Sequence, residues 1–413
     1  MDTLHQMTSQ GRHWPAGLTR IPFWVYQDPA VLAVEQEKLF QGPVWNFLAL
    51  DIEIPEPGDW RATFIGSMPV VVVRQADGSV AAFENRCAHR GALICFEDEG
   101  RAAKDFTCVY HAWRYDLAGN LASVAFQRGV NGKGGMPADF CPRDHGPRKL
   151  RAESFCGIVF GTLSDATPDI ETYIGPEVGR RIRLIAGKKL EILGRCVEAL
   201  PNNWKLYAEN LRDSYHASLL HLFFATFKIN RLSQRGGITV SAAGGNHVSE
   251  TFAPDQAQDV AYAGMRSVDD DFALNDPSML AAADEYGDGI QQQVNSVFPN
   301  FGLIRTRNAL ALRYYLPNGR GQTDLHFIYL GYADDSAETR TNRLRQLNLT
   351  GPAGYVSLED GCIGGFVERG AAAAGDCSSI MEMGGSGADS QDNRVSEAAI
   401  RGFWKQWRAV TGY

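Results

Sequence analysis

The chain has 413 residues, of which 44% are hydrophobic and 21% are charged, and its formal net charge is −8. This length predicts two domains, and this composition is that of an ordinary soluble globular protein. The acidic balance argues against a nucleic-acid or membrane-surface partner, and because we find neither a long apolar run nor a signal-peptide core, we expect a cytoplasmic protein.

The sequence from about residue 44 to residue 165 contains short β-strand patterns separated by turn signals. The β-branched run Met68–Arg74 is followed by the turn signal Ala76–Ser79 and by a second strand that runs into Cys87. A further hairpin signal covers Tyr115–Leu121. We therefore expect a small β domain whose hairpin ends carry rigid loops.

Two short clusters on these loops combine cysteine with histidine, Cys87-Ala-His89 and Cys108-Val-Tyr-His111. Mixed pairs are the ligand set of a Rieske [2Fe–2S] centre, in which two histidines replace two cysteines on one iron. A structural zinc site also uses two cysteines and two histidines, but it usually places the cysteine pair before the histidine pair. The repeated cysteine-then-histidine order favours the iron–sulfur cluster. The six other cysteines show no disulfide framework, and we expect them to be small buried thiols.

From about residue 166 strands alternate with helices, and the longest helical candidate extends from Pro201 to about residue 227. This helix looks buried on most sides, although it carries Asp213, His216 and His221. The two histidines lie about 140° apart on an ideal helix, so a shared metal requires a distortion such as a π-bulge. Two histidines and a carboxylate form the facial triad of non-haem Fe(II) oxygenases. A pair of satisfied core histidines is the alternative.

Taken together, the two motifs resemble the catalytic alpha subunit of the Rieske non-haem iron aromatic-ring-hydroxylating oxygenases. The resemblance covers nearly the whole chain and is carried by NRCAHRGA, VYHAWRYD, NNWKLYAENLRDSYHASLLH, GPAGYVSLEDG and RGFWKQWRAVTGY. It implies an α+β fold, with a small all-β Rieske domain over residues 44–165 and a catalytic domain over residues 166–413. The catalytic domain would wrap an antiparallel sheet around helices (helix-grip type), and residues 1–43 would pack on it.

The resemblance also implies the ligand sets. Cys87, His89, Cys108 and His111 would hold the [2Fe–2S] cluster, and His216, His221 and Asp360 would hold the mononuclear Fe(II). Within GPAGYVSLEDG the likeness points to Asp360 rather than Glu359 as the third iron ligand. Composition cannot choose between these two residues, and a solvated acidic turn is the alternative.

Asp213 has an implied role in catalysis. In the resembled family the matching aspartate bridges an iron-bound histidine and a cluster histidine of the next protomer, here His216 and His111. A carboxylate on the second nitrogen of a metal-bound histidine fixes its tautomer. The implied assembly is a homotrimer of alpha subunits with a small beta subunit (α3β3), served by an NAD(P)H-dependent reductase. The implied reaction adds O₂ to an aromatic ring as a cis-1,2-diol.

Two arginines are candidates for substrate binding. Residues 308–316 are expected to form a strand whose alternation puts Arg313 on a face with small residues, where it could meet a carboxylate. A surface arginine is equally compatible with this periodicity. Arg394 precedes an amphipathic C-terminal helix that contains Ile400 and Trp404, and its alternative is an ordinary solvated residue.

Within the family, Arg313 and Arg394 match the carboxylate-binding arginines of members that act on terephthalate. Ala242-Ala243 stands where that group carries a serine suited to the second carboxylate. The expected substrate is therefore an aromatic carboxylate, with terephthalate first and salicylate, anthranilate or a halobenzoate as alternatives. A Rieske electron carrier is the alternative from another class, but it needs only the first domain and leaves about 250 residues without a function.

Overall fold

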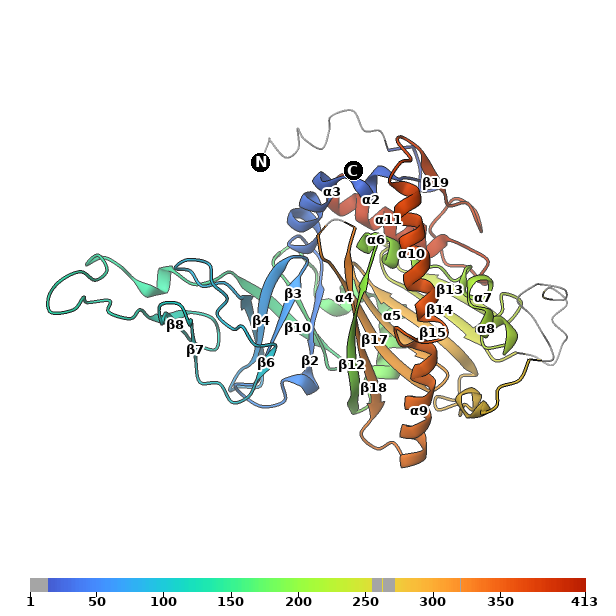
Figure 1. Ribbon diagram of the computed structural model, residues 1–413, viewed down its shortest axis with the longest axis horizontal. Helices are drawn as coiled ribbons and strands as arrows, with labels where there is room; N and C mark the ends of the chain where they lie inside the picture. The colour runs from blue at the N-terminus through green and yellow to red at the C-terminus, as the bar shows by residue number, and fades with distance from the viewer. Residues whose placement is uncertain (1–13, 255–261, 263–271, 320) are drawn as a thin grey trace. The chain divides into compact units, whose positions relative to one another are not determined.

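The computed structural model describes residues 14–254, 262, 272–319 and 321–413 (Figure 1). The chain forms two compact units. The small unit is Phe40–Tyr173, and the large unit is Ile174–Tyr413 together with the N-terminal residues up to Leu39. The small unit is built on β-sheets and the large unit mixes helices with an antiparallel sheet, which confirms the expected α+β class. Within the described ranges, no helix is long and apolar enough to cross a bilayer.

The small unit contains a seven-stranded sheet in the order β2-β11-β10-β5-β4-β3-β6 and a three-stranded sheet in the order β7-β8-β9. Its short helical turns are η2 (Asp51–Glu53) and η3 (Pro142–Asp144), and α4 (Ile170–Ile174) ends at the boundary of the unit. The strands are β2 (Asn46–Leu50), β3 (Trp60–Ile65), β4 (Met68–Arg74), β5 (Val80–Glu84), β6 (Glu99–Gly100), β7 (Phe106–Thr107), β8 (Arg114–Tyr115), β9 (Leu121–Ser123), β10 (Lys149–Phe155) and β11 (Ile158–Thr162).

Both hairpins expected in this unit are confirmed. Strands β4 and β5 pair from Arg74↔Val80 onward, and the Asp77 carboxylate closes the turn by accepting the Ser79 N–H at 2.9 Å. Strands β8 and β9 pair around Tyr115↔Leu121. The core of the unit gathers aromatic and aliphatic side chains together with the Cys87 and Cys108 thiols. The cysteine side chains are therefore anchored in the core while their loops reach outward.

The large unit contains a seven-stranded antiparallel sheet in the order β12-β18-β17-β16-β15-β14-β13. Its strands are β12 (Leu190–Leu200), β13 (Gly236–Val240), β14 (His247–Phe252), β15 (Ile290–Val297), β16 (Phe301–Thr306), β17 (Ala309–Pro317) and β18 (Thr323–Tyr332). A separate ribbon pairs β1 (Arg20–Pro22) with β19 (Ser378–Ile380). The strand expected over residues 308–316 is confirmed as β17, which pairs with β18.

Helices of the large unit pack against this sheet, with α6 in contact with β17, α10 and α11 (Figure 1). This arrangement places the middle of the chain between its C-terminal helices and the sheet. The helices are α2 (Trp24–Gln27), α3 (Pro29–Val34), the π-helical η1 (Glu35–Phe40), α5 (Pro176–Ala186), α6 (Trp204–Asn210), α7 (Ala217–Leu220), α8 (Leu222–Thr226), η5 (Pro277–Leu280), α9 (Ala337–Thr350), α10 (Ser357–Ala371) and α11 (Ala398–Thr411).

The expectation of one long helix from Pro201 with a π-bulge is wrong. The segment is broken into α6, α7 and α8, and a turn separates α6 from α7. In that turn the Asp213 carboxylate accepts the N–H groups of Tyr215 at 2.8 Å and His216 at 3.1 Å. An aspartate that bonds its own local backbone offers the chain an alternative to the helix. Helix α6 begins at Trp204, and the Asn203 side chain caps it by accepting the Lys205 N–H.

Candidate metal centres

The two cysteine–histidine loops have the same backbone design. The carbonyls of Cys87 and Cys108 accept the N–H four residues on, from Gly91 and Ala112, at 2.9 Å in each loop. Gly91 has φ 76° and Ala112 has φ 53°, so both loops turn through the left-handed region at the same step. Each cysteine N–H also donates to the carbonyl five residues on. The repeated sequence pattern is thus a repeated structure that presents one cysteine and one histidine per loop.

The ligand side chains separate by type. Cys87 and Cys108 are each only 2% exposed and neighbour one another, and burial together with Cys87 raises the pKa of Cys108. The rings of His89 and His111 are exposed, with centroids 4.5 Å apart. Among the described residues, these four side chains do not converge on one point as a tetrahedral zinc site requires. A pair of buried thiols beside a pair of outer imidazoles fits a two-iron Rieske cluster.

Neighbours of the cluster loops were missed by the sequence analysis. The Tyr115 hydroxyl donates to Cys87 Sγ at 3.1 Å and accepts the Ala88 N–H at 2.9 Å. The Trp113 ring stacks on His89, with centroids 4.8 Å apart and planes 6° apart. Tyr115 and Trp113 lie in the VYHAWRYD motif, yet their contacts depend on how the loop folds back. Hydrogen bonds to cluster sulfur and burial are the means by which a protein sets the potential of such a centre.

The expectation that the six other cysteines are buried is wrong for most of them. Cys95 is buried and burial raises the pKa of its thiol to about 12, so it stays neutral inside the core. Cys362 and Cys377 are exposed, and the remaining three are partly buried. The loop around Cys95 is held by the buried Asn85 side chain, which accepts the Cys95 N–H at 2.8 Å and donates to its carbonyl at 2.7 Å.

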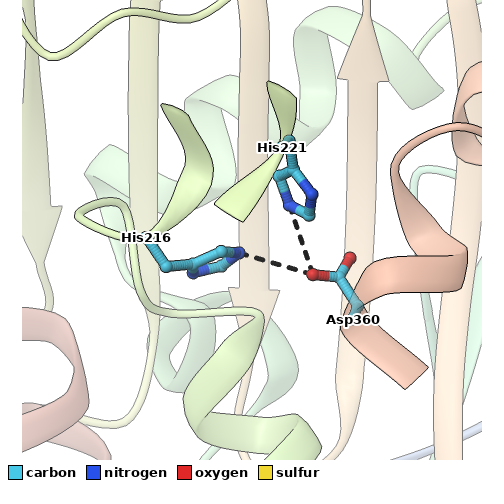
Figure 2. Close-up of side chains that lie close together, drawn as sticks. All are labelled: His216, His221 and Asp360. Atoms are coloured by element: carbon cyan, nitrogen blue, oxygen red, sulfur yellow. Dashed lines mark ion pairs between the residues drawn. The ribbon is translucent and has the colours of Figure 1, made fainter. Parts of the chain in front are cut away.

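In the large unit, three side chains from two separate segments of the chain point at one another, as Figure 2 shows. His216 lies just before α7, His221 separates α7 from α8, and Asp360 belongs to the first turn of α10. Asp360 Oδ1 lies 3.4 Å from His216 Nε2 and 3.2 Å from His221 Nε2. One ligand atom from each residue falls within 4.8 Å of the other two. The three donors can therefore bind one ion and leave positions open for other ligands, as in a facial triad.

A second carboxylate lies beside each imidazole of this triad. Glu359 Oε2 is 2.8 Å from His221 Nδ1, and Asp213 Oδ2 is 3.3 Å from His216 Nδ1 without hydrogen-bond geometry. Burial lowers the pKa of His216, but Asp213 and Asp360 outweigh it and raise that pKa to about 10. The site thus favours a cation at this point. The contact between Glu359 and His221 was not predicted from the sequence, where Glu359 is only an alternative to Asp360 as the third ligand.

A cavity opens beside the triad. Arg313 and Arg394 both line it, together with His216, His221 and Asp360. The alternative that both arginines lie at the protein surface is therefore wrong, because Arg313 is 6% exposed and Arg394 is 2% exposed.

Neither arginine of the cavity forms an ion pair with an acidic side chain of the described residues. Arg313 donates to the Tyr207 hydroxyl, the Thr350 carbonyl and Ser357 Oγ, each at 2.9 Å. Arg394 donates to the Asn230 side chain and to backbone carbonyls. Burial lowers the pKa of Arg394 to about 10, and the Nε atoms of both arginines are buried with no hydrogen-bond partner in the part of the chain that the structure describes.

Ala242 and Ala243, which stand where a serine was expected from the family pattern, do not line the cavity. Both alanines are exposed in a turn after β13, whereas the hydroxyl groups that line the cavity include those of Ser249 and Thr251 on β14. A serine is thus present at the cavity wall even though none stands at positions 242 and 243. The position of this wall depends on strand register, which a sequence match across a loop does not fix.

Comparison with known proteins covers both parts of the chain. Residues 44–132 match the Rieske [2Fe-2S] domain family, and residues 180–412 match the ring hydroxylating alpha subunit (catalytic domain) family. The chain is 52% identical to the terephthalate 1,2-dioxygenase terminal oxygenase component subunit alpha 2 of Comamonas sp, over 95% of this chain and 96% of that protein. The chain belongs to the ring-hydroxylating dioxygenases, as an oxygenase alpha subunit.

Other relatives of this alpha subunit have different substrates in their names. The anthranilate 1,2-dioxygenase large subunit of Burkholderia cepacia is 42% identical over 96% of this chain and 94% of its own. The salicylate 5-hydroxylase large oxygenase component of Ralstonia sp is 36% identical over 98% and 97%. The solved structure of naphthalene 1,2-dioxygenase from Rhodococcus sp. has the same fold, with a TM-score of 0.78, 20% identity, and coverage of 99% and 96%.

Membership of this family makes the alpha subunit an oxidoreductase that carries a Rieske [2Fe–2S] cluster and mononuclear iron. The geometry fits both groups: paired thiols beside paired imidazoles in the small unit, and a converging triad of two histidines and an aspartate in the large unit.

Proposed function

We propose that this alpha subunit binds terephthalate and catalyses its cis-1,2-dihydroxylation with O₂ and electrons from NAD(P)H. The observation that carries the proposal is a pair of buried arginines, Arg313 and Arg394, in the wall of the cavity beside the triad. Neither has an acidic partner within the described ranges of the chain. The relative that acts on terephthalate is 52% identical, which supports the same choice.

A buried guanidinium needs a counter-charge, because moving an unpaired ion out of water is costly. Carboxylates pair with guanidinium in a planar, bidentate geometry. Arg394 has no acidic partner among the described residues. The charge of Asp360 acts on Arg313, but the two side chains form no ion pair. Two such cations favour a substrate with two carboxylates. A monocarboxylate would leave one of them uncompensated, although the relatives named for anthranilate and salicylate keep that class as the second candidate.

We assign the ligands as the sequence suggested. Cys87, His89, Cys108 and His111 would hold the cluster, and His216, His221 and Asp360 would hold the iron. When bound, these groups supply single electrons and activate O₂. The residues of the chain supply orientation: Arg313 and Arg394 fix the carboxylates of the ring, and so decide which ring carbons face the triad.

Asp213 is proposed as the link between protomers in a trimer of alpha subunits joined by a small beta subunit. Its carboxylate lies beside His216 and lines both the substrate cavity and a second hollow. It is therefore reachable from outside the substrate cavity, as contact with His111 of the next protomer requires. The domain boundaries proposed here are residues 44–165 for the Rieske domain and 166–413 for the catalytic domain, preceded by residues 1–43.

The test is turnover with a panel of benzene mono- and dicarboxylates, using the reconstituted alpha subunit and a compatible flavin reductase. We expect O₂ uptake in step with substrate loss for terephthalate, and weaker coupling for benzoate, salicylate and anthranilate. If a monocarboxylate is consumed efficiently while terephthalate is not, the dicarboxylate proposal is wrong and the second candidate replaces it.

A further inference from the structure

A series of oxidisable rings extends through the large unit from the substrate cavity to the surface. Arg313, in the cavity wall, donates to the Tyr207 hydroxyl at 2.9 Å. The ring centroids of Tyr207 and Tyr315 are 5.1 Å apart, and those of Tyr315 and Trp204 are 6.4 Å apart. We call this series the aromatic chain: Tyr207, Tyr315, Trp204, Trp407, Trp404 and Trp14.

The outer part of the aromatic chain is held by the C-terminal helix. The rings of Trp407 and Trp404 on α11 lie 5.2 Å apart, and Trp14 lies 5.7 Å from Trp407. Trp14 is only partly buried, so small molecules in solution can reach the outer end. Helices α6 and α11, which carry the inner and outer rings, are in contact (Figure 1). Within the inner part and within the outer part, electron transfer between neighbouring rings needs only short steps.

Two buried carboxylates distinguish the aromatic chain from an ordinary aromatic core. Glu35 is 0% exposed and accepts the indole N–H groups of Trp204 and Trp407, each at 2.9 Å. Lys205 Nζ lies 2.8 Å from the same carboxylate.

The second carboxylate, Glu209, is 9% exposed and accepts the Trp404 indole N–H and the Tyr26 hydroxyl, each at 2.6 Å. Burying a carboxylate is expensive, and packing alone does not require it. In both cases the carboxylate contacts the one atom of an indole that loses a proton when the ring is oxidised.

We propose that the aromatic chain carries oxidising equivalents away from the metal site when O₂ is activated without productive attack on a substrate ring. Tryptophan and tyrosine are among the side chains that are most easily oxidised by one electron. If an oxygenase activates O₂ without a substrate, the resulting oxidant otherwise reacts with the side chains that line the pocket. The chain would thus protect the pocket and is separate from the dihydroxylation reaction.

The step balances with groups that are present. An O₂-derived oxidant in the cavity takes one electron from the inner rings, and Trp204 replaces that electron. The Trp204 indole proton passes to Glu35, which leaves a neutral tryptophanyl radical and a protonated carboxyl group. Trp407 gives an electron to Trp204, and Glu35 returns the proton to Trp204 and accepts the indole proton of Trp407. A one-electron reductant in solution, such as ascorbate, supplies the final electron at Trp14, after which Glu35 returns the proton to Trp407. No atom of the chain is lost and no oxygen is added to it.

The experiment uses the holoenzyme, reduced and then mixed with O₂ in the absence of any aromatic acid, with freeze-quenching and electron paramagnetic resonance. Peptide mass spectrometry of the same samples locates added oxygen atoms. The test variant is Trp204→Phe. The matched control is Trp45→Phe, because Trp45 is equally buried, donates to a backbone carbonyl rather than a carboxylate, and belongs to the small unit.

We expect a tryptophanyl radical in the wild type and in Trp45→Phe, and loss of most of that signal in Trp204→Phe, because oxidation reaches the outer indoles through Trp204. The same variant should gain oxygen on side chains at or next to the cavity wall, such as Tyr207, which contacts Arg313. If Trp204→Phe does not fold, Trp14→Phe interrupts the partly exposed end, and there the radical should persist longer in the presence of ascorbate. A wild-type enzyme without a protein radical at any quench time overturns the proposal, and so do equal yields in Trp204→Phe and Trp45→Phe.

Discussion

Replacing Arg394 with leucine should remove the preference for a second carboxylate. Arg394 is 2% exposed, lines the cavity and has no acidic partner among the described residues. Truncating one partner of a buried, hydrogen-bonded charge pair costs about 2–5 kcal/mol. At about 1.4 kcal/mol per factor of ten, the dissociation constant for terephthalate should rise about 30-fold or more. Benzoate, which needs one arginine, should bind nearly as well as to the wild type.

The fold should tolerate this change. Leucine removes a buried cation, which offsets part of the loss of its hydrogen bonds to Asn230 and to backbone carbonyls. Arg401→Leu is the matched control, because Arg401 is 0% exposed and donates to carbonyls, yet does not line the cavity. It should lower the melting temperature without changing the affinity for terephthalate.

The assay is isothermal titration of anaerobic enzyme with terephthalate and with benzoate. Burial lowers the pKa of Arg394 to about 10. The guanidinium is therefore charged below that pH and loses its charge as the pH rises through about 10. Terephthalate affinity of the wild type should therefore fall near pH 10, whereas that of Arg394→Leu should lack this step. Wild-type affinity for terephthalate in Arg394→Leu, or an equal loss for benzoate, would refute the reasoning.

Three further substitutions test the metal centres. Asp360→Ala should abolish turnover and iron binding while the visible spectrum of the cluster stays intact; retained activity would remove Asp360 from the ligands. Asp213→Ala should keep both metals but block electron delivery, and a normal single-turnover rate would contradict the link between protomers. Glu359→Ala removes the partner of His221 and should weaken iron binding about 10- to 100-fold in a chelator competition, whereas unchanged affinity would show that the contact at 2.8 Å is incidental.

Local signals in the sequence predicted the parts of the fold that local chemistry decides. Asp77 and Gly78 form the turn between β4 and β5 because the aspartate bonds the backbone and glycine tolerates φ 85°. The two cysteine–histidine loops were predicted from their spacing. Ala112, at φ 53°, occupies the position that Gly91 fills in the other loop. Because alanine rarely adopts a positive φ, composition alone did not indicate that the two turns are alike.

Competing local bonds and long-range contacts decided the features that sequence patterns missed. The break between α6 and α7 depends on whether the Asp213 side chain bonds its own backbone or leaves the helix intact, and periodicity cannot weigh those two states. The burial of Arg394 depends on packing against residues more than 160 positions away. Glu35 is an unremarkable acidic residue in the sequence, yet it joins Trp204 and Trp407 across the large unit.

The most direct test of the proposed function is mass spectrometry of the product formed from terephthalate under ¹⁸O₂ by the reconstituted enzyme and its reductase. We predict a cis-dihydrodiol of the dicarboxylate in which both new hydroxyl oxygens carry the label. A product with one labelled oxygen would contradict dihydroxylation. Recovery of unchanged terephthalate, from an enzyme that holds both metal centres and oxidises another aromatic acid, would contradict the substrate assignment.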